Sequence, residues 1–86
     1  MPVISTFFGI VVRMYYQEHG VPRFHAEYQG QQSTFRMDGE ILAGTLLSRT
    51  ALRLIREWSL VHGDELHANW EKARAGEPLD RIPPLD

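Results

Sequence analysis

The sequence contains no cysteine, so neither a disulfide nor a thiolate metal site stabilises this fold. It also lacks a long apolar run. The longest one, residues 7–12, is interrupted by Gly9 and ends at Arg13, far short of the roughly 20 residues that a membrane-spanning helix needs. Residues 1–6 have no basic start and no apolar core of the signal-peptide kind. We therefore expect a soluble, cytoplasmic protein with no membrane partner.

An excess of charge of one sign is also missing. The formal net charge is −2, which gives no overall attraction to nucleic acid or acidic lipid, so any such binding requires a local patch. Charged residues make up 23% and apolar residues 43% of the 86 positions, as in an ordinary globular protein. We expect one domain, residues 1–86. A chain of this length buries only roughly 60–65% of its unfolded surface, so a homo-oligomer is one way to gain stability.

Four segments have the composition and the alternation of β-strands. Residues 7–17 are rich in β-branched and aromatic side chains. Residues 23–28, 32–38 and 40–46 follow, and turn residues (Gly20 with Pro22, Gly30, Asp38-Gly39) separate the segments. Strands joined by such short turns form an antiparallel meander.

The pattern changes to helical spacing after Leu47. Ser48 is a suitable N-cap, and Gly63-Asp64 divides the helical region, with Gly63 predicted to end one helix and Asp64 to cap the next. Gly76 and Pro78 end the second helix, and residues 77–86 contain three prolines, which predicts an extended tail.

These elements predict an α+β fold: a four-stranded antiparallel meander followed by two C-terminal helices packed on one sheet face. Alternation then assigns the apolar strand residues to the core with the two tryptophans. The predicted core residues are Phe24, Ala26, Phe35, Met37, Trp58 and Trp70. The residues predicted on the opposite face are Arg13, Tyr15, Arg23, His25, Glu27, Thr34 and Arg36.

This opposite face has two interpretations. Arginines beside flat rings on an open sheet are typical of surfaces that stack RNA bases and pair with phosphates. The alternative is an ordinary solvated face on which Glu27 and Asp38 neutralise the arginines across strands.

His19 and His25 also have two interpretations. They could act as a general acid and base, with Arg23 holding a phosphate, in a metal-independent ribonuclease. Alternatively, His19 is a turn residue and His25 a cross-strand hydrogen-bonding partner, since no serine, cysteine or paired-carboxylate constellation accompanies them. A metal site needs three or four ligands, and Arg23 would repel a cation here, so we expect no metal and no cofactor.

Several stretches together resemble a known family. They are Pro2–Ser5 with Phe7–Tyr16, His19–Tyr28, Arg49–Trp58, His62, Asn69-Trp70, Ala73, Gly76–Pro78 and Ile82–Leu85. The sequence is similar to the prokaryotic domain-of-unknown-function 4160 family. The family has no established activity, so the resemblance implies none. Its members often occur beside a second small protein, and such pairs have been proposed to be toxin–antitoxin-like. The resemblance therefore implies a protein partner or an RNA target. The family's turn pattern is His-x-Pro-Pro-His-Phe-His, whereas this sequence has Val21 and Arg23 in place of the first proline and the middle histidine.

We therefore expect a binding module, part of a toxin–antitoxin-like pair, that meets a protein partner or RNA on the exposed sheet face. The residues expected to bind are Arg13, Tyr15, Glu27 and Arg36, together with His19, Arg23 and His25. One alternative is a ribonuclease-like toxin in which His19, His25 and Arg23 are catalytic. The other is a purely protein-interaction subunit that uses an exposed edge strand or the proline-rich tail.

Overall fold

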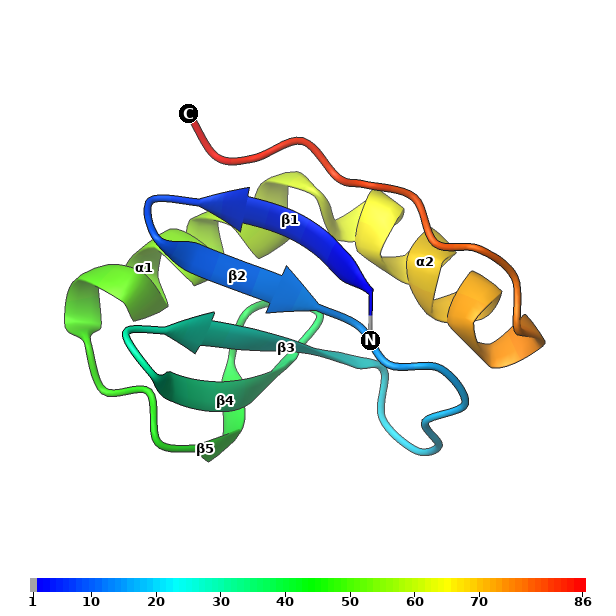
Figure 1. Cartoon of the computed structure of the whole chain (residues 1–86), viewed down its shortest axis with the longest axis horizontal. Coiled ribbons are helices and arrows are strands. Elements are labelled where there is room, and N and C mark those ends of the chain that lie inside the picture. Colours follow the sequence, from blue (N-terminus) through cyan, green and yellow to red (C-terminus); the bar gives the residue numbers. More distant parts are fainter. Residues whose placement is uncertain (1) are drawn as a thin grey trace.

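The computed structural model describes residues 2–86 and shows an antiparallel sheet followed by two helices (Figure 1). The strands are β1 (Val3–Phe7), β2 (Ile10–Arg13), β3 (Arg23–Tyr28), β4 (Gln31–Arg36) and β5 (Ile41–Gly44). The helices are α1 (Arg49–Val61) and α2 (Gly63–Ala75). The predicted α+β class is confirmed, but the predicted number of four strands is wrong, because the sheet has five strands in the order β1-β2-β3-β4-β5. Neither helix is long and apolar enough to cross a membrane.

The additional strand comes from a hairpin at the beginning of the chain. The predicted strand 7–17 is wrong because the chain reverses at Phe8 and Gly9, between Phe7 and its partner Ile10. Phe8 has φ 49° and Gly9 has φ 80°, as both residues of a type I′ turn require. Glycine adopts such a φ readily and phenylalanine rarely does, so only Gly9 signalled this turn. β2 then ends at Arg13, and residues 14–22, here called the β2–β3 loop, contain no strand.

A bulge in β1 changes which of its side chains face the core. Val3 lies opposite Arg13, but Ser5 lies opposite Val12, which leaves Ile4 as the extra residue. Ile4 and Ser5 are consecutive and both buried, whereas a regular strand would turn them to opposite faces. The Ser5 hydroxyl has no hydrogen-bond partner among residues 2–86, so the bulge places an unsatisfied polar group in the core.

Two of the four ends of α1 and α2 follow capping rules. The Ser48 hydroxyl accepts the backbone N–H of Ala51 at 3.2 Å, as predicted, and Gly76 ends α2 with φ 74°. The predicted boundary at Gly63 and Asp64 is wrong. His62 alone joins the helices, and Gly63 is already the first residue of α2. His62 turns the chain with φ −110°, so no glycine is needed there.

The core lies between the sheet and the two helices, which cover one sheet face (Figure 1). The ring of Trp58 in α1 lies 5.4 Å from that of Phe7 and 5.7 Å from that of Phe24. All six residues predicted for the core are buried, which confirms the alternation on which the prediction depended. The other face of the sheet is left without a covering layer (Figure 1).

Residues 77–86 contain no helix or strand and run past α2 and along β1 (Figure 1). The backbone N–H of Ile82 donates to the carbonyl of Ile4 in β1 at 2.7 Å, and the indole N–H of Trp58 donates to the carbonyl of Pro83 at 2.9 Å. The side chain of Ile82 is buried. This tail therefore occupies the free edge of β1 and belongs to the folded unit.

Candidate functional site

The residues predicted for the exposed side do share the uncovered side of the sheet, which we call the outer face. Arg13 lies opposite His25, and His25 lies opposite Thr34. Arg23 lies opposite Arg36 at the end of the same pair of strands. Directly paired residues of antiparallel strands project from the same side. The outer face is therefore the surface around Arg13, Tyr15, Arg23, His25, Glu27, Thr34 and Arg36.

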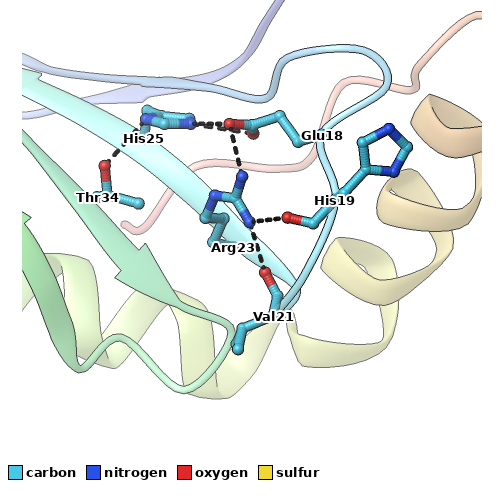
Figure 2. Close-up of polar contacts among 6 residues, drawn as sticks. All are labelled: Glu18, His19, Val21, Arg23, His25 and Thr34. Atoms are coloured by element: carbon cyan, nitrogen blue, oxygen red, sulfur yellow. Dashed lines mark hydrogen bonds and ion pairs between the residues drawn. The ribbon is translucent and has the colours of Figure 1, made fainter.

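His25 is the centre of a hydrogen-bonded group on this face (Figure 2). Its Nε2 lies 3.1 Å and 3.2 Å from the two carboxylate oxygens of Glu18, and its Nδ1 lies 3.2 Å from the hydroxyl of Thr34. An ionised carboxylate only accepts hydrogen bonds. In the neutral imidazole, Nε2 therefore carries the hydrogen and Nδ1 accepts from Thr34. The ring of Tyr15 lies 4.3 Å from that of His25, so the imidazole is fixed by three neighbours.

Arg23 ties the β2–β3 loop to the sheet. Its Nη1 donates to the backbone carbonyls of His19 at 2.8 Å and Val21 at 3.0 Å, and its Nη2 donates to Glu18 at 3.2 Å (Figure 2). Its guanidinium also lies 5.8 Å from the centre of the Trp70 ring in α2, within the range of a cation–π contact. Glu18 thus serves both Arg23 and His25, and all three side chains are largely shielded from solvent.

The other two arginines of the outer face differ from each other. Arg13 pairs with Glu27 at 2.8 Å, in agreement with the interpretation that Glu27 neutralises an arginine across strands. Arg36 is exposed, and it forms no ion pair with any residue in the described range 2–86. Arg36 is therefore the arginine of this face whose charge remains available to a ligand.

His19 lies in the β2–β3 loop and His25 lies in β3. Their imidazole rings do not contact each other. Figure 2 shows the imidazole of His19 directed away from His25, while its backbone carbonyl accepts from Arg23. A general acid and a general base must both reach the reacting group. The structure thus brings His25 and Arg23 together with Glu18 and leaves the His19 ring outside the group. Among residues 2–86, no group of three or more His, Asp or Glu side chains could hold a metal ion.

Glu18 is the member of this hydrogen-bonded group that the sequence analysis did not single out. It lies in the β2–β3 loop, where side-chain direction has no simple period, unlike the strands that placed His25 and Thr34. The sequence contains only an indirect indication of this role. Glu18 precedes the turn, and the strand that follows the turn begins with Arg23.

We predict that Glu18→Gln loosens the β2–β3 loop. A neutral amide keeps the shape of the side chain but loses the charge-assisted bonds to Arg23 and His25. We expect the free energy of unfolding to fall by about 1–2 kcal/mol, measured by urea denaturation, and amide hydrogen exchange to accelerate in residues 14–22. The control is Glu57→Gln, because Glu57 pairs with Arg53 at 3.8 Å on the exposed side of α1 and should change stability by less than about 0.5 kcal/mol. Equal effects of the two variants would contradict the prediction.

Comparison with known proteins gives one result. The model of a protein family described as "Domain of unknown function (DUF4160)" matches residues 9–71. The match runs from the β1–β2 turn into α2 and contains every residue of the outer face. No match was found among curated proteins or among solved structures.

Proposed function

This chain belongs to the family described as Domain of unknown function (DUF4160), and we propose that it works as a binding module whose outer face contacts a partner protein. One observation carries the proposal: the helices cover one side of a five-stranded sheet and leave the outer face without a covering layer (Figure 1). The partner would be the second small protein of a toxin–antitoxin-like pair.

Three side chains of the outer face, those of Arg13, Arg23 and His25, are held by contacts within the chain itself. Glu18 and Thr34 hold His25 from both ring nitrogens, and Glu27 holds Arg13. Association orders side chains at a cost of about 0.5–1.5 kcal/mol for each one that is immobilised. A surface whose side chains are ordered by its own contacts avoids much of this cost, which supports a binding role.

The charges of the outer face support a protein partner more than RNA. Arg13 is paired with Glu27 and Arg23 with Glu18, so Arg36 is the arginine of the outer face that has no ion pair among residues 2–86. Sequence-independent affinity for nucleic acid comes from Lys and Arg side chains that replace counterions at phosphates. Mixed charges held in pairs are a weak phosphate surface, whereas tyrosine and arginine, here Tyr15 and Arg36, are residue types enriched at protein interfaces.

The edges of the sheet are less suitable for a partner than its outer face. The tail is hydrogen-bonded to β1 at Ile4. At the opposite edge, Thr34 pairs with Ala43 and Phe35 with Ile41, which makes Leu42 a bulge in β5. Bulges interrupt the regular row of backbone groups that an added strand needs. This geometry favours binding through the face over strand addition.

The proposal is limited to binding and does not extend to RNA cleavage. Cleavage by His19 and His25 needs both imidazoles within reach of one phosphate, and Figure 2 shows the His19 ring turned away from His25. Arg23, assigned to the phosphate in that alternative, has its donors directed to Glu18 and to backbone carbonyls.

The test uses two substitutions that place bulk on the outer face without removing a contact. Gln32 and Ala43 are exposed and lie opposite Glu27 and Thr34. The partner is first captured with the wild-type protein from cells that produce it naturally, and then purified. We expect Gln32→Arg and Ala43→Arg to weaken its binding at least about tenfold, a loss of about 1.4 kcal/mol, with unchanged thermal melting.

The control variant is Arg53→Glu, on the exposed side of α1, which should bind the partner like the wild type. Equal binding by all three variants would overturn the proposal. A captured RNA would also overturn it, and the measurement distinguishes this outcome: the added arginines would then raise the affinity, and the affinity would fall steeply with salt.

A further inference from the structure

An open hollow of about 390 Å³ lies where the β2–β3 loop meets the helices. It is lined by Val21 and Pro22 of the loop, by Arg36 at the end of β4 and Met37 directly after it, and by Leu60 of α1. We call this space the loop–helix hollow. Its volume is in the range of sites that receive ligand groups or side chains.

Two apolar side chains that line this hollow are exposed to solvent. Val21 is 47% exposed and Leu60 is 61% exposed, although both line a concave surface. Single exposed apolar residues need no explanation, but apolar residues that gather around a hollow mark interaction sites. Met37, which is largely buried, adds a flexible side chain that adapts to what it contacts.

The polar groups that line the hollow indicate which polar group of a ligand could bind there beside an apolar side chain. Arg36 has no carboxylate partner within the described chain. Asp38 also lines the hollow, but one of its oxygens accepts the backbone N–H of Glu40 at 2.9 Å and stabilises the β4–β5 turn. A guanidinium binds a carboxylate with two parallel hydrogen bonds, so a carboxylate is the group that Arg36 fits best.

We propose that the loop–helix hollow receives an apolar side chain of the partner protein, and that a carboxylate next to this side chain pairs with Arg36. The inference rests on the proposed function and names the chemistry of the partner's contact segment. Arg36 belongs to the outer face and to the hollow at the same time, so one partner reaches both surfaces without a gap. Anchor side chains that fill pockets dominate the binding energy of protein interfaces, and charged pairs at the rim contribute less.

A peptide titration tests the hollow directly. The full-length ¹⁵N-labelled protein is titrated with the blocked peptide acetyl-Leu-Glu-Leu-amide and followed by its amide NMR signals. We expect shifts at Val21, Met37 and Leu60, with a Kd on the order of 1 mM, the affinity of a weak contact. The peptide acetyl-Leu-Gln-Leu-amide, which has the same shape without the charge, should bind about two- to fivefold more weakly, as expected for the loss of an exposed ion pair.

Three variants complete the test. Arg36→Gln should bring the two peptides to the same affinity, and Leu60→Ser should weaken both about tenfold by removing the apolar wall. Arg53→Gln, a charge change elsewhere on α1, should leave both titrations unchanged. Shifts outside the hollow, no shifts at concentrations ten times the expected Kd, or equal affinities of the two peptides for the wild type would each overturn the inference.

The two proposals fail separately. If the peptides do not bind while Gln32→Arg and Ala43→Arg still weaken partner binding, the proposal for the loop–helix hollow is wrong and the proposal for the outer face is retained. If the peptides bind as expected while those two variants bind the partner like the wild type, the loop–helix hollow is retained as a binding site and the proposal for the outer face is wrong.

Discussion

Asn69→Ala is expected to lower the free energy of unfolding by about 1–3 kcal/mol, the net contribution of two hydrogen bonds, and to release the tail from α2. Asn69 is 1% exposed. Its amide donates to the carbonyl of Asp80 at 2.8 Å, and its side-chain oxygen accepts the backbone N–H of the same residue at 3.0 Å. The side chain thus pairs with the tail as a neighbouring strand would.

The loss of stability should exceed the contribution of these two hydrogen bonds, because the tail is held at several successive points. Ile82 follows Asp80 by two residues and bonds to Ile4, and Pro83 accepts from Trp58. Once Asp80 is free, these contacts have to hold a longer mobile segment, and fixing each backbone residue costs roughly 1–2 kcal/mol. The edge of β1 would then be accessible, so association at high protein concentration is expected to increase.

Lys72→Ala is the matched control for Asn69→Ala. Lys72 forms an ion pair with the carboxylate of the same residue, Asp80, but on the exposed surface. Such pairs contribute about 0–1 kcal/mol. Urea denaturation of both variants, with the amide signals of residues 80–83 as a local probe, measures the difference. If Asn69→Ala costs no more than Lys72→Ala, the side-chain amide does not anchor the tail.

The strand and helix patterns that the sequence predicted well are those controlled by a period. Phe24 and Ala26 alternate with His25 and Glu27, and the structure turns these pairs to opposite sides of β3 as predicted. The N-cap at Ser48 was also predictable, because capping depends on one hydroxyl and a backbone N–H three residues later. Local rules of this kind need no knowledge of the rest of the fold.

The features that the sequence did not predict depend on contacts between distant segments or on unusual backbone angles. Phe8 adopts a positive φ, against the preference of its residue type, because the β1–β2 hairpin requires it. Glu18 contacts His25 across seven positions, and Asn69 contacts Asp80 across eleven. Since loops and tails have no period, the direction of these side chains follows only from the assembled fold.

Gly44→Ala is expected to cost about 3 kcal/mol or more, since it combines backbone strain with overpacking, each worth about 1–3 kcal/mol. Gly44 has φ 123°, a value that residues with a Cβ rarely adopt. A Cβ there would lie 2.4 Å from both the carbonyl oxygen of Gln32 and the Cα of Ser33. These are backbone atoms of the neighbouring strand, which cannot move aside without opening the sheet.

The strand β5 would have to separate from β4 to accommodate this methyl group. The bonds nearest to Gly44 would be lost first: the N–H of Thr45 donates to Gln32 at 2.8 Å, and the N–H of Leu46 donates to the Ser33 hydroxyl at 2.9 Å. A domain of this size is stable by only about 5–15 kcal/mol, so we expect a large fall in the melting temperature and fast amide exchange at Thr45 and Leu46.

The control for Gly44→Ala is Gly63→Ala, the same chemical change at the start of α2. Gly63 has no positive φ, and an added Cβ there meets nothing within 4 Å. Alanine favours a helix over glycine by up to about 1 kcal/mol, so this variant should be as stable as the wild type or more stable. Thermal and urea unfolding should therefore show a loss of stability for Gly44→Ala and no loss for Gly63→Ala. A Gly44→Ala protein as stable as Gly63→Ala would show that β5 does not need its close approach to β4.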